Sequence, residues 1–399
     1  MTKRFFTYGL FLTLLSGILP ANGQSSGLDH VPARPRLEPT ACEMRMKEEL
    51  DREDTLRICI LGDMMLHTAQ LQQALQDGGD PHEASAYRFD CFRLIADRLK
   101  EADLTIANLE FTLAGPPYSG YPCFSAPDTY AQYAAECGID VFLTANNHIL
   151  DKGSRGAART LEIYRQMETS HGIRWTGCSP EGSPACAPLL LDLDRTRLAL
   201  LNFTYGTNVG KDQHWPEINY LRQRTVDEAF RLAERGGADF CIALPHWGAE
   251  YQLRHSSSQH KAAEMLVEAG ADVIIGAHPH VIQDQESFRK DGQEIQVLYS
   301  LGNAVSNMSA RDTQAGLLAH LTLVRKMNGT LEVLPVRATW LWCSRPGGYS
   351  QSYTVLPIAE YIGRRSDWTG PWDYDKMMAT WKRVSKVTGI AFSAETEEK

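Results

Sequence analysis

The sequence predicts a layered α/β fold whose strands are mostly central in their sheets. Short apolar runs alternate with amphipathic stretches along most of the chain, which is the order of elements in α/β proteins. Hydrophobic residues make up 43% and charged residues 22%, as in an ordinary soluble globular protein. The 399 residues are enough for one large domain or two modest ones with a sizeable core.

Residues 1–23 are predicted to be a signal peptide. Two basic residues precede the uncharged apolar run Phe5–Leu19, and the small residues of Ala21–Gly23 follow where a signal peptidase would cut. The run is short for a membrane-spanning helix, which needs about 20 residues, so an uncleaved membrane anchor is the alternative. No cysteine precedes Cys42, which argues against a lipoprotein anchor. The expected location is periplasmic, cell-surface or extracellular.

Residues 24–54 are predicted to form a linker and a short helix, and residues 55–360 the α/β domain. Its strands are expected at Leu56–Leu61, Leu104–Ala107, Val141–Thr144, Leu198–Phe203, Phe240–Leu244, Val273–Gly276 and Val297–Ser300. Its helices are expected at Cys91–Glu101, Thr129–Glu136, Ala157–Glu168, Thr225–Arg235 and Ser258–Glu268. Gly316–Arg325 and Leu331–Leu341 should pair as a hairpin, because Asn328-Gly329 between them suits a tight turn. Residues 361–399 are predicted to be a helical tail with a disordered acidic end.

Charge and cysteine content narrow the possible partners. The net charge is -9 and no strong basic cluster occurs, so nucleic acid is not expected as a partner. An anionic substrate would need a metal ion or a few basic side chains. The nine cysteines follow no zinc-ribbon spacing. Cys178 and Cys186, which flank a loop rich in glycine and proline, are the best-placed pair for a disulfide, but their spacing does not predict one.

Metal-type ligands follow nearly every predicted strand, at the carboxyl ends where α/β folds carry their functional residues. These residues are Asp63, then Glu110, then the adjacent Asn147 and His148, then His246, and finally His278 and His280. A single aspartate after a strand is usually a turn or a helix cap, and a single buried histidine is usually a hydrogen-bonded core residue. The combined series suits two cations with mixed oxygen and nitrogen ligands.

The order of these residues resembles that of the calcineurin-like metallophosphoesterases. More specific motifs resemble the CapA family of poly-γ-glutamate capsule synthesis proteins over roughly residues 56–310. These motifs are Gly62-Asp63-x-Met65, Asn108-Leu109-Glu110, Asn146-Asn147-His148-x-x-Asp151-x-Gly153, His246-Trp247-Gly248-x-Glu250-Tyr251, Gly270-Ala271-Asp272-Val273, His278-Pro279-His280 and Ser300-Leu301-Gly302-Asn303. The resemblance implies a four-layer αββα sandwich with metals at one end.

The resemblance also implies a role for each residue. One or two divalent metal ions, with Mn, Zn or Fe as options, would be held in two sets that share Glu110 as the bridge. The first set is Asp63, Glu110 and His280, and the second is Glu110, Asn147, His246 and His278. His148 would be the acid or the transition-state stabiliser, oriented by Asp151. The chain departs from the phosphoesterase pattern at Met65, where the pattern has a histidine, so the first set lacks an imidazole unless His67 or water replaces it.

Three functions remain open from the sequence. The first is a metal-dependent hydrolase acting on a phosphoester or on an amide of a cell-surface polymer. The second is a non-catalytic assembly or export component for an anionic polymer such as poly-γ-glutamate, working with membrane-associated capsule machinery. The third is a binding module with one structural metal. Lys152, Arg155 and Arg254 could contact an anionic substrate, although solvated surface charge is their commoner role. Trp247 and Tyr251 could line a pocket or simply pack.

Overall fold

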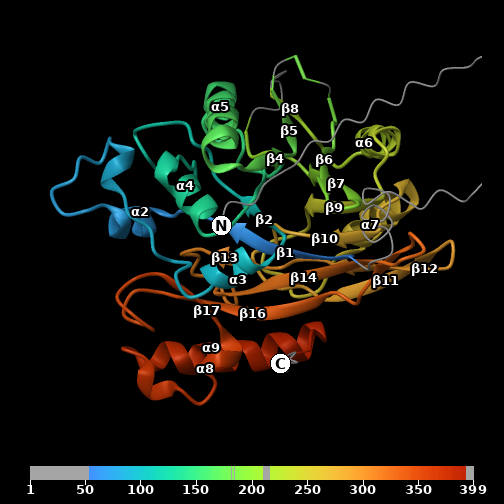
Figure 1. The fold of residues 1–399 in the computed structure, drawn as a ribbon. Coiled ribbons are helices and arrows are strands. Elements are labelled where there is room, and N and C mark those ends of the chain that lie inside the picture. The colour runs from blue at the N-terminus through green and yellow to red at the C-terminus, as the bar shows by residue number, and fades with distance from the viewer. Residues whose placement is uncertain (1–53, 181, 184, 210–215, 392–399) are drawn as a thin grey trace, which may run out of the picture.

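The computed structural model describes residues 54–180, 182–183, 185–209 and 216–391 (Figure 1). The predicted signal peptide, linker and short helix in residues 1–53, and the acidic end at residues 392–399, lie outside the described residues. Within the part of the chain that the structure describes, every helix is too short or too polar to cross a lipid bilayer.

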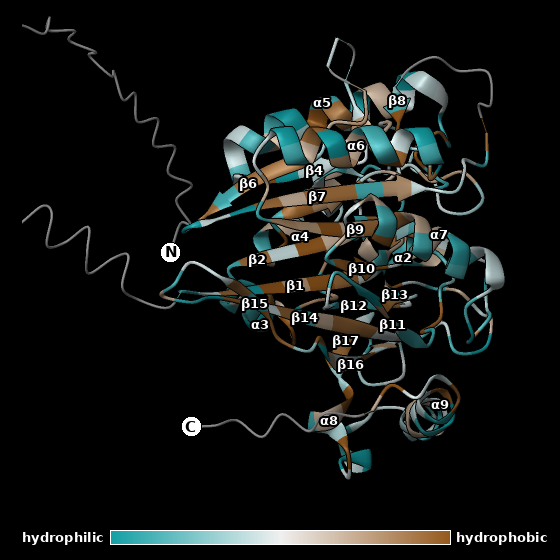
Figure 2. Cartoon of the chain, turned by 90° about the vertical axis from the view of Figure 1, so that its right-hand side faces the viewer, coloured by the Kyte–Doolittle hydropathy of each residue, from teal (hydrophilic) through white to brown (hydrophobic). Residues whose placement is uncertain are grey.

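Two sheets stack face to face in the described residues, and helices cover their outer faces (Figures 1 and 2). The first sheet runs β17-β16-β14-β1-β2-β3-β4, with β13 beside β1 and β15 beside β14. Its strands are β1 (Asp54–Met64), β2 (Leu104–Leu109), β3 (Val141–Leu143), β4 (Arg174–Thr176), β13 (Asn303–Val305), β14 (Ala315–Arg325), β15 (Leu331–Val333), β16 (Arg337–Ser344) and β17 (Thr354–Pro357). The strands β1 to β4 are parallel.

The second sheet runs β11-β12-β10-β9-β7-β6, and β7, β9, β10 and β12 are parallel in it. Its strands are β6 (Leu189–Leu193), β7 (Thr196–Thr204), β9 (Phe240–His246), β10 (Val273–Ile275), β11 (Gln285–Lys290) and β12 (Gln293–Leu298). A small separate sheet pairs β5 (Cys178–Ser179) with β8 (Glu217–Ile218).

The helices flank the sheets, as the alternating sequence predicts. They are α2 (Thr68–Ala74), α3 (Ala96–Glu101), α4 (Asp128–Glu136), α5 (Gly153–His171), α6 (Gln223–Arg235), α7 (Ser257–Ala269), α8 (Ile358–Tyr361) and α9 (Pro371–Thr388), with 3₁₀ turns at Ala84–Ala86 and Arg365–Asp367. Along β1, Ile58 and Ile60 belong to the core between the sheets, whereas Cys59 and Leu61 belong to the core beneath the helices. Because successive side chains point to opposite faces, a strand buried on both faces is apolar throughout. The predicted αββα sandwich is confirmed.

Two details of the sheets differ from the sequence-based expectations, and the two cysteines considered for a disulfide do not form one. The strand expected over Leu331–Leu341 is divided into β15 and β16, because Pro335 between them has no amide hydrogen for the ladder. A hairpin of β11 and β12, joined by Asp291 and Gly292 at positive φ, stands where only its second strand was expected. Cys178 and Cys186 are both free thiols.

The carboxyl-terminal helix α9 packs on the same core as the sheets. It lies beside β16 (Figure 1), and Met377 and Val384 are fully buried in the cluster that includes Trp340 and Trp342 of β16. Asp373 of α9 accepts hydrogen bonds from the indole nitrogen of Trp342 at 3.2 Å and the hydroxyl of Ser344 at 2.6 Å. The helical tail therefore completes the sandwich instead of standing apart from it.

Candidate metal centre

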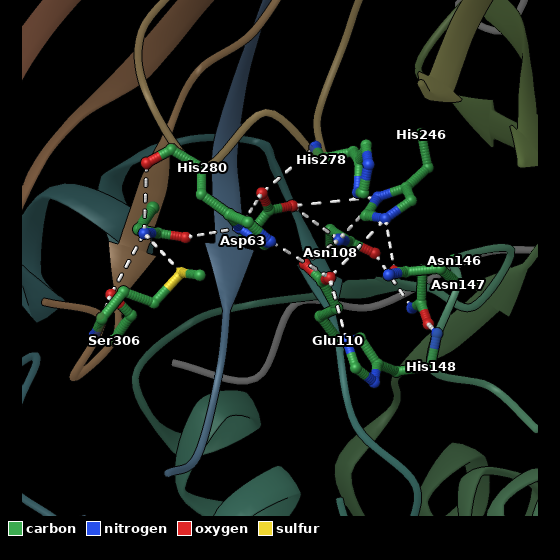
Figure 3. Close-up of polar contacts among 12 residues, drawn as sticks. Asp63, Asn108, Glu110, Asn146, Asn147, His148, His246, His278, His280 and Ser306 are labelled. Carbon is green, nitrogen blue, oxygen red and sulfur yellow. Dashed lines mark hydrogen bonds and ion pairs between the residues drawn. The ribbon is translucent and has the colours of Figure 1, made fainter. Parts of the chain in front are cut away.

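The six predicted metal ligands meet at the carboxyl ends of strands from both sheets (Figure 3). Asp63 lies near the end of β1, Glu110 directly after β2, Asn147 after β3, His246 at the end of β9, and His278 and His280 after β10. All six are buried, with at most 3% of each residue exposed. Parallel strands end at the same edge of a sheet, which is why residues far apart in sequence gather here.

Glu110 lies at the centre of the group. Its Oε1 atom is 3.6 Å from His246 Nε2, 3.7 Å from His280 Nε2 and 3.8 Å from His148 Nε2. The same oxygen is buried without a hydrogen-bond partner, as is Nδ1 of His278. Buried polar atoms are nearly always paired, so two unpaired atoms in one cluster fit a site whose donors bind a cation.

The donor set fits a divalent cation. Ligand atoms of Glu110, His278 and His280 lie within 4.8 Å of one another, and so do those of Asp63, Glu110 and His246. Asn147 Oδ1 lies 2.9 Å from His246 Nε2, which places it beside the second group. Carboxylate, amide and imidazole donors suit Zn²⁺, Mn²⁺ or Fe²⁺. Glu110 belongs to both groups, as a bridging ligand must. The groups divide the histidines differently from the two sets that the resemblance implies, because Asp63 is grouped with His246, and His278 with His280.

Burial keeps two histidines of the cluster in the neutral form that binds a metal ion. Burial lowers the pKa of His246 to about 3 and that of His278 well below its ordinary value, so both imidazoles are neutral near pH 7. Burial, followed by the charge of Asp63, raises the pKa of Glu110 well above its usual range. A cation between the two carboxylates would offset their repulsion and keep Glu110 ionised.

Asp63 is held in place by neutral donors and by His280. Asn108 donates from Nδ2 to Asp63 Oδ1 at 2.7 Å, and the backbone amide of His278 donates to Oδ2 at 3.1 Å. Burial alone would raise the pKa of Asp63, but the hydrogen bond from His280 at 3.2 Å, with the attraction of that imidazole when it is protonated, leaves the pKa below its ordinary value. His278 and His280 have φ values of 98° and 58°, a conformation that costs about 1–3 kcal/mol for each residue. Such strain is common where backbone is fixed for function.

His148 lies on the opposite side of Glu110 from Asp63 (Figure 3) and belongs to neither ligand group. Its Nδ1 atom is 2.7 Å from Asp151 Oδ2, so its Nε2 atom faces Glu110. The ring of Phe124 packs edge-on against the imidazole at 4.7 Å between centroids. Asp151 also accepts the backbone amide of Phe124 at 2.7 Å, which fixes both side chains together. Asp151 therefore has the orienting position that the resemblance implies.

The position that departs from the phosphoesterase pattern is occupied by a core residue. Met65 is 1% exposed and belongs to the hydrophobic cluster beneath the helices. His67 does not join either ligand group. Its Nδ1 accepts the backbone amide of Asn307 at 3.2 Å and lies the same distance from Gln70 Oε1, and its ring packs on Phe124. Neither residue replaces the absent imidazole.

The other residues considered in the sequence take ordinary positions. Arg155 is exposed, Lys152 is partly buried just before α5, and Arg254 pairs with Asp284 at 3.3 Å. Trp247 is buried and donates to the carbonyl of Tyr299 at 2.9 Å, so it is a core residue.

Tyr251 lies at the rim of the centre. It is 42% exposed, and its ring centroid is 6.5 Å from that of His280. Tyr205 is 50% exposed, and its ring centroid is 4.7 Å from that of His278. Two exposed aromatic rings therefore flank the cluster.

Four asparagines complete the centre, and sequence reasoning assigned none of them a role. Asn108 positions Asp63, and Asn146 donates to Asn108 Oδ1 at 3.2 Å and accepts the amide of His148 at 3.1 Å. Asn303 Oδ1 is 3.1 Å from His280 Nδ1, and Asn208 Nδ2 is 3.3 Å from His148 Nδ1. Asn108, Asn146 and Asn303 belong to the motifs quoted above, so their position at strand ends was a usable signal. Asn208 lies in an irregular loop and belongs to none of the motifs at strand ends.

Gly62 is needed for the placement of Asp63. The register of β1 against β2 shifts between Leu61 and Asp63, a bulge that re-aims the carboxylate. A Cβ atom at Gly62 would lie 1.9 Å from the carbonyl oxygen of Gly302, which also accepts the amide of Asp63 at 3.0 Å. This oxygen is a backbone atom, so it cannot move away from a new side chain without a shift of the main chain at Gly302.

Gly62→Ala is therefore expected to lower the free energy of unfolding by about 1–3 kcal/mol, the usual effect of overpacking, and to weaken metal retention. Urea denaturation and metal analysis after dialysis would measure both effects. Gly206→Ala is the control, because a Cβ atom there meets nothing within 4 Å. Equal stability of the two variants would contradict the role given to Gly62.

The fold and the centre together define a class: four-layer α/β proteins with carboxylate and imidazole donors gathered at the carboxyl ends of two stacked sheets. The family model described as "Bacterial capsule synthesis protein PGA_cap" matches residues 57–308, well over half of the chain. The chain belongs to this family of bacterial capsule synthesis proteins. The resemblance seen in the sequence motifs is thereby confirmed.

Curated relatives carry matching descriptions. The capsule biosynthesis protein CapA of Bacillus anthracis is 27% identical over 260 residues, which cover 61% of this chain and 60% of that protein. The PGA biosynthesis protein CapA of Bacillus subtilis is 27% identical over 204 residues, covering 50% and 51%. The chain thus spans between half and three-fifths of the length of these relatives. Among solved structures, the NAD nucleotidase of Haemophilus influenzae is similar at 14% identity and a TM-score of 0.44, over 84% of this chain and 68% of that one.

Proposed function

We propose that this protein is an exported metal-dependent hydrolase that acts on a phosphoester or amide bond during the synthesis of an anionic cell-surface polymer such as poly-γ-glutamate. Membership of a capsule synthesis family supports the process. The names of its relatives in Bacillus support the polymer. The convergent donor set supports the dependence on metal.

One observation carries the proposal of catalysis: the His148–Asp151 pair beside the ligand cluster. A structural metal site has no use for an imidazole that is oriented by a carboxylate and yet ligates nothing. His148 turns its Nε2 atom to the ligand cluster while Asp151 holds Nδ1 at 2.7 Å. This is the arrangement of a residue that donates a proton to a leaving group or stabilises developing negative charge.

The roles of the side chains follow from their positions. Asp63, Glu110, Asn147, His246, His278 and His280 would hold one or two divalent cations. Bound there, the cations would activate a water molecule and neutralise negative charge on the scissile group. Asn108 keeps Asp63 oriented, and Asp151 keeps the Nε2 atom of His148 directed at the reacting bond. The exposed rings of Tyr205 and Tyr251 offer contacts for an extended substrate beside the centre.

The test is a hydrolysis screen on the purified chain, with metal content measured in the same samples. Phosphomonoesters, phosphodiesters and γ-glutamyl peptides are the substrates, each tested with Mn²⁺, Zn²⁺ and Fe²⁺. Turnover that is lost with a chelator and restored by one of these ions is expected. Full metal loading without turnover on any substrate class would rule out the hydrolase.

Metal loading without turnover would favour the non-catalytic alternative, which is a metal-binding assembly or export component that works with membrane-associated capsule machinery. The specific observation in its favour is Met65, which is packed in the hydrophobic core where the phosphoesterase pattern has an imidazole. One of the two ligand sets is poorer for this reason, and a poorer set favours binding over two-metal catalysis.

Export is a separate prediction. Residues 1–23 are expected to be removed and the protein to be found outside the cytoplasm, because a basic segment, an apolar run and small residues follow in the order that a signal peptidase requires. Amino-terminal sequencing of protein from fractionated native cells would give the start of the mature chain. Soluble cytoplasmic protein that still begins at Met1 would contradict the prediction.

A further inference from the structure

A second group of imidazole and carboxylate side chains lies on the outer side of the second sheet and shares no residue with the candidate metal centre. It consists of His255 in the loop before α7, His260 in the first turns of α7, and Glu286 on the edge strand β11. One ligand atom from each of the three lies within 4.8 Å of the others. Each residue is partly exposed, so solvent can reach the group.

The spacing matches that of a tetrahedral metal ion. Glu286 Oε2 is 3.0 Å from His260 Nδ1 and 3.9 Å from His255 Nε2. Metal–ligand bonds of about 2.0–2.1 Å at tetrahedral angles place neighbouring ligand atoms about 3.3 Å apart. The two measured distances bracket that value. Glu264, one turn along α7 from His260, has Oε1 at 3.5 Å from His260 Nε2, the ring nitrogen that does not face Glu286, so it can orient this imidazole from behind.

Buried groups behind these side chains hold two of them in place. Asp284, itself buried, lies 3.0 Å from His255 Nδ1, which leaves Nε2 turned to Glu286. The hydroxyl of the buried Tyr299 donates to Glu286 Oε2 at 2.7 Å, and its ring stacks on His255 at 3.9 Å between centroids. A carboxylate on the far nitrogen of an imidazole is the usual support of a metal-binding histidine.

We propose that His255, His260 and Glu286 form a second, structural site for a zinc ion or a similar divalent transition metal, with the fourth position taken by water. Two imidazoles and a carboxylate favour Zn²⁺ over Mg²⁺ or Ca²⁺, which prefer oxygen ligands. An ion pair between His260 and Glu286 alone would explain neither the orientation of His255 Nε2 nor its support by Asp284.

The position of this site suggests what a metal would do there. His255 ends the loop that follows His246, and Glu286 follows His280 by six residues, through the segment that leads into β11. An ion bound by both residues would link the loop that follows His246 to the segment that leads from His280 into β11. Trp247, next to His246, stacks on Tyr299 at 5.7 Å and so connects the two places through packed side chains. The second site would therefore stiffen the support of His246.

Zinc stoichiometry of the full chain tests the proposal. Protein stripped with a chelator is dialysed against buffered Zn²⁺, and bound zinc is counted per chain for the wild type, for H255A/H260A and for E286Q. Each change is expected to remove one zinc equivalent or to weaken the binding of one by more than about 100-fold, beyond the roughly 10–100-fold that loss of a supporting group alone would cost. When Co²⁺ replaces Zn²⁺, the absorption of the same variants should be lower than that of the wild type by the contribution of one tetrahedral Co²⁺ ion.

His171→Ala is the matched control, since it removes an exposed imidazole from the end of α5 on the other sheet's outer face. It should leave the zinc count unchanged. E286Q keeps the size of Glu286 and its hydrogen bond to Tyr299, so it reports on metal binding even if the double alanine variant fails to fold. The proposal is overturned if E286Q, or a folded H255A/H260A, binds as much zinc as the wild type.

Discussion

Replacing His246 by alanine is expected to remove most of the metal that the protein retains through dialysis. The imidazole is 1% exposed and lies between Asn147 Oδ1 at 2.9 Å and Glu110 Oε1 at 3.6 Å, so its removal takes a nitrogen donor from the middle of the donor set. Loss of an outer supporting residue alone costs about 10–100-fold in metal affinity, and loss of a ligand should exceed that. Elemental analysis after dialysis, with affinities from competition against a chelator, gives the result.

The matched control is His320→Ala. His320 lies in β14, with Nε2 2.8 Å from the hydroxyl of Thr339 and Nδ1 3.4 Å from the thiol of Cys59, so it is another packed histidine of the sandwich. Its loss should lower stability while leaving metal content unchanged. If both variants keep their metal, the assignment of His246 as a ligand is wrong. If both lose it, the metal depends on the fold in general and the variants do not identify a ligand.

The convergence of the six candidate ligands could be predicted because it follows from the order of the strands and the stacking of the two sheets. Apolar runs mark the strands, and the carboxyl ends of parallel strands meet at one edge, so polar residues just after the runs must lie together. Glu110 and His246 are 136 residues apart in sequence, yet their side chains are 3.6 Å apart for this reason.

Other features of the centre depend on packing that no local pattern encodes. Met65 could equally have faced the ligands, and only the burial of its side chain beneath the helices shows that it does not. The role of Asn208 requires the path of an irregular loop. The group formed by His255, His260 and Glu286 exists because the β11–β12 hairpin packs beside α7, and the first strand of that hairpin was not recognised. Its alternating polar pattern is that of an edge strand, which the search for apolar runs misses.

Replacing His148 by alanine is expected to leave metal content intact and to lower turnover by about 10²–10⁴-fold, the usual contribution of a general acid or base. His148 belongs to neither ligand group, so its removal takes no donor from the metals. Its Nε2 atom is 3.8 Å from Glu110 Oε1 and faces the cluster without being needed for metal binding. The measurement is kcat on whichever substrate the screen identifies, together with elemental analysis of the same sample.

Asp151→Asn tests the orienting role in the same assay. Asparagine can still accept the amide of Phe124, so the loop around residue 124 should stay in place. It removes the negative charge beside Nδ1, and a smaller fall in kcat than for His148→Ala is expected, with an altered pH–rate profile because the imidazole loses its charged partner at 2.7 Å. An unchanged pH profile would make Asp151 a purely structural residue. Loss of metal from His148→Ala would place His148 among the ligands and remove the observation on which the proposal of catalysis depends.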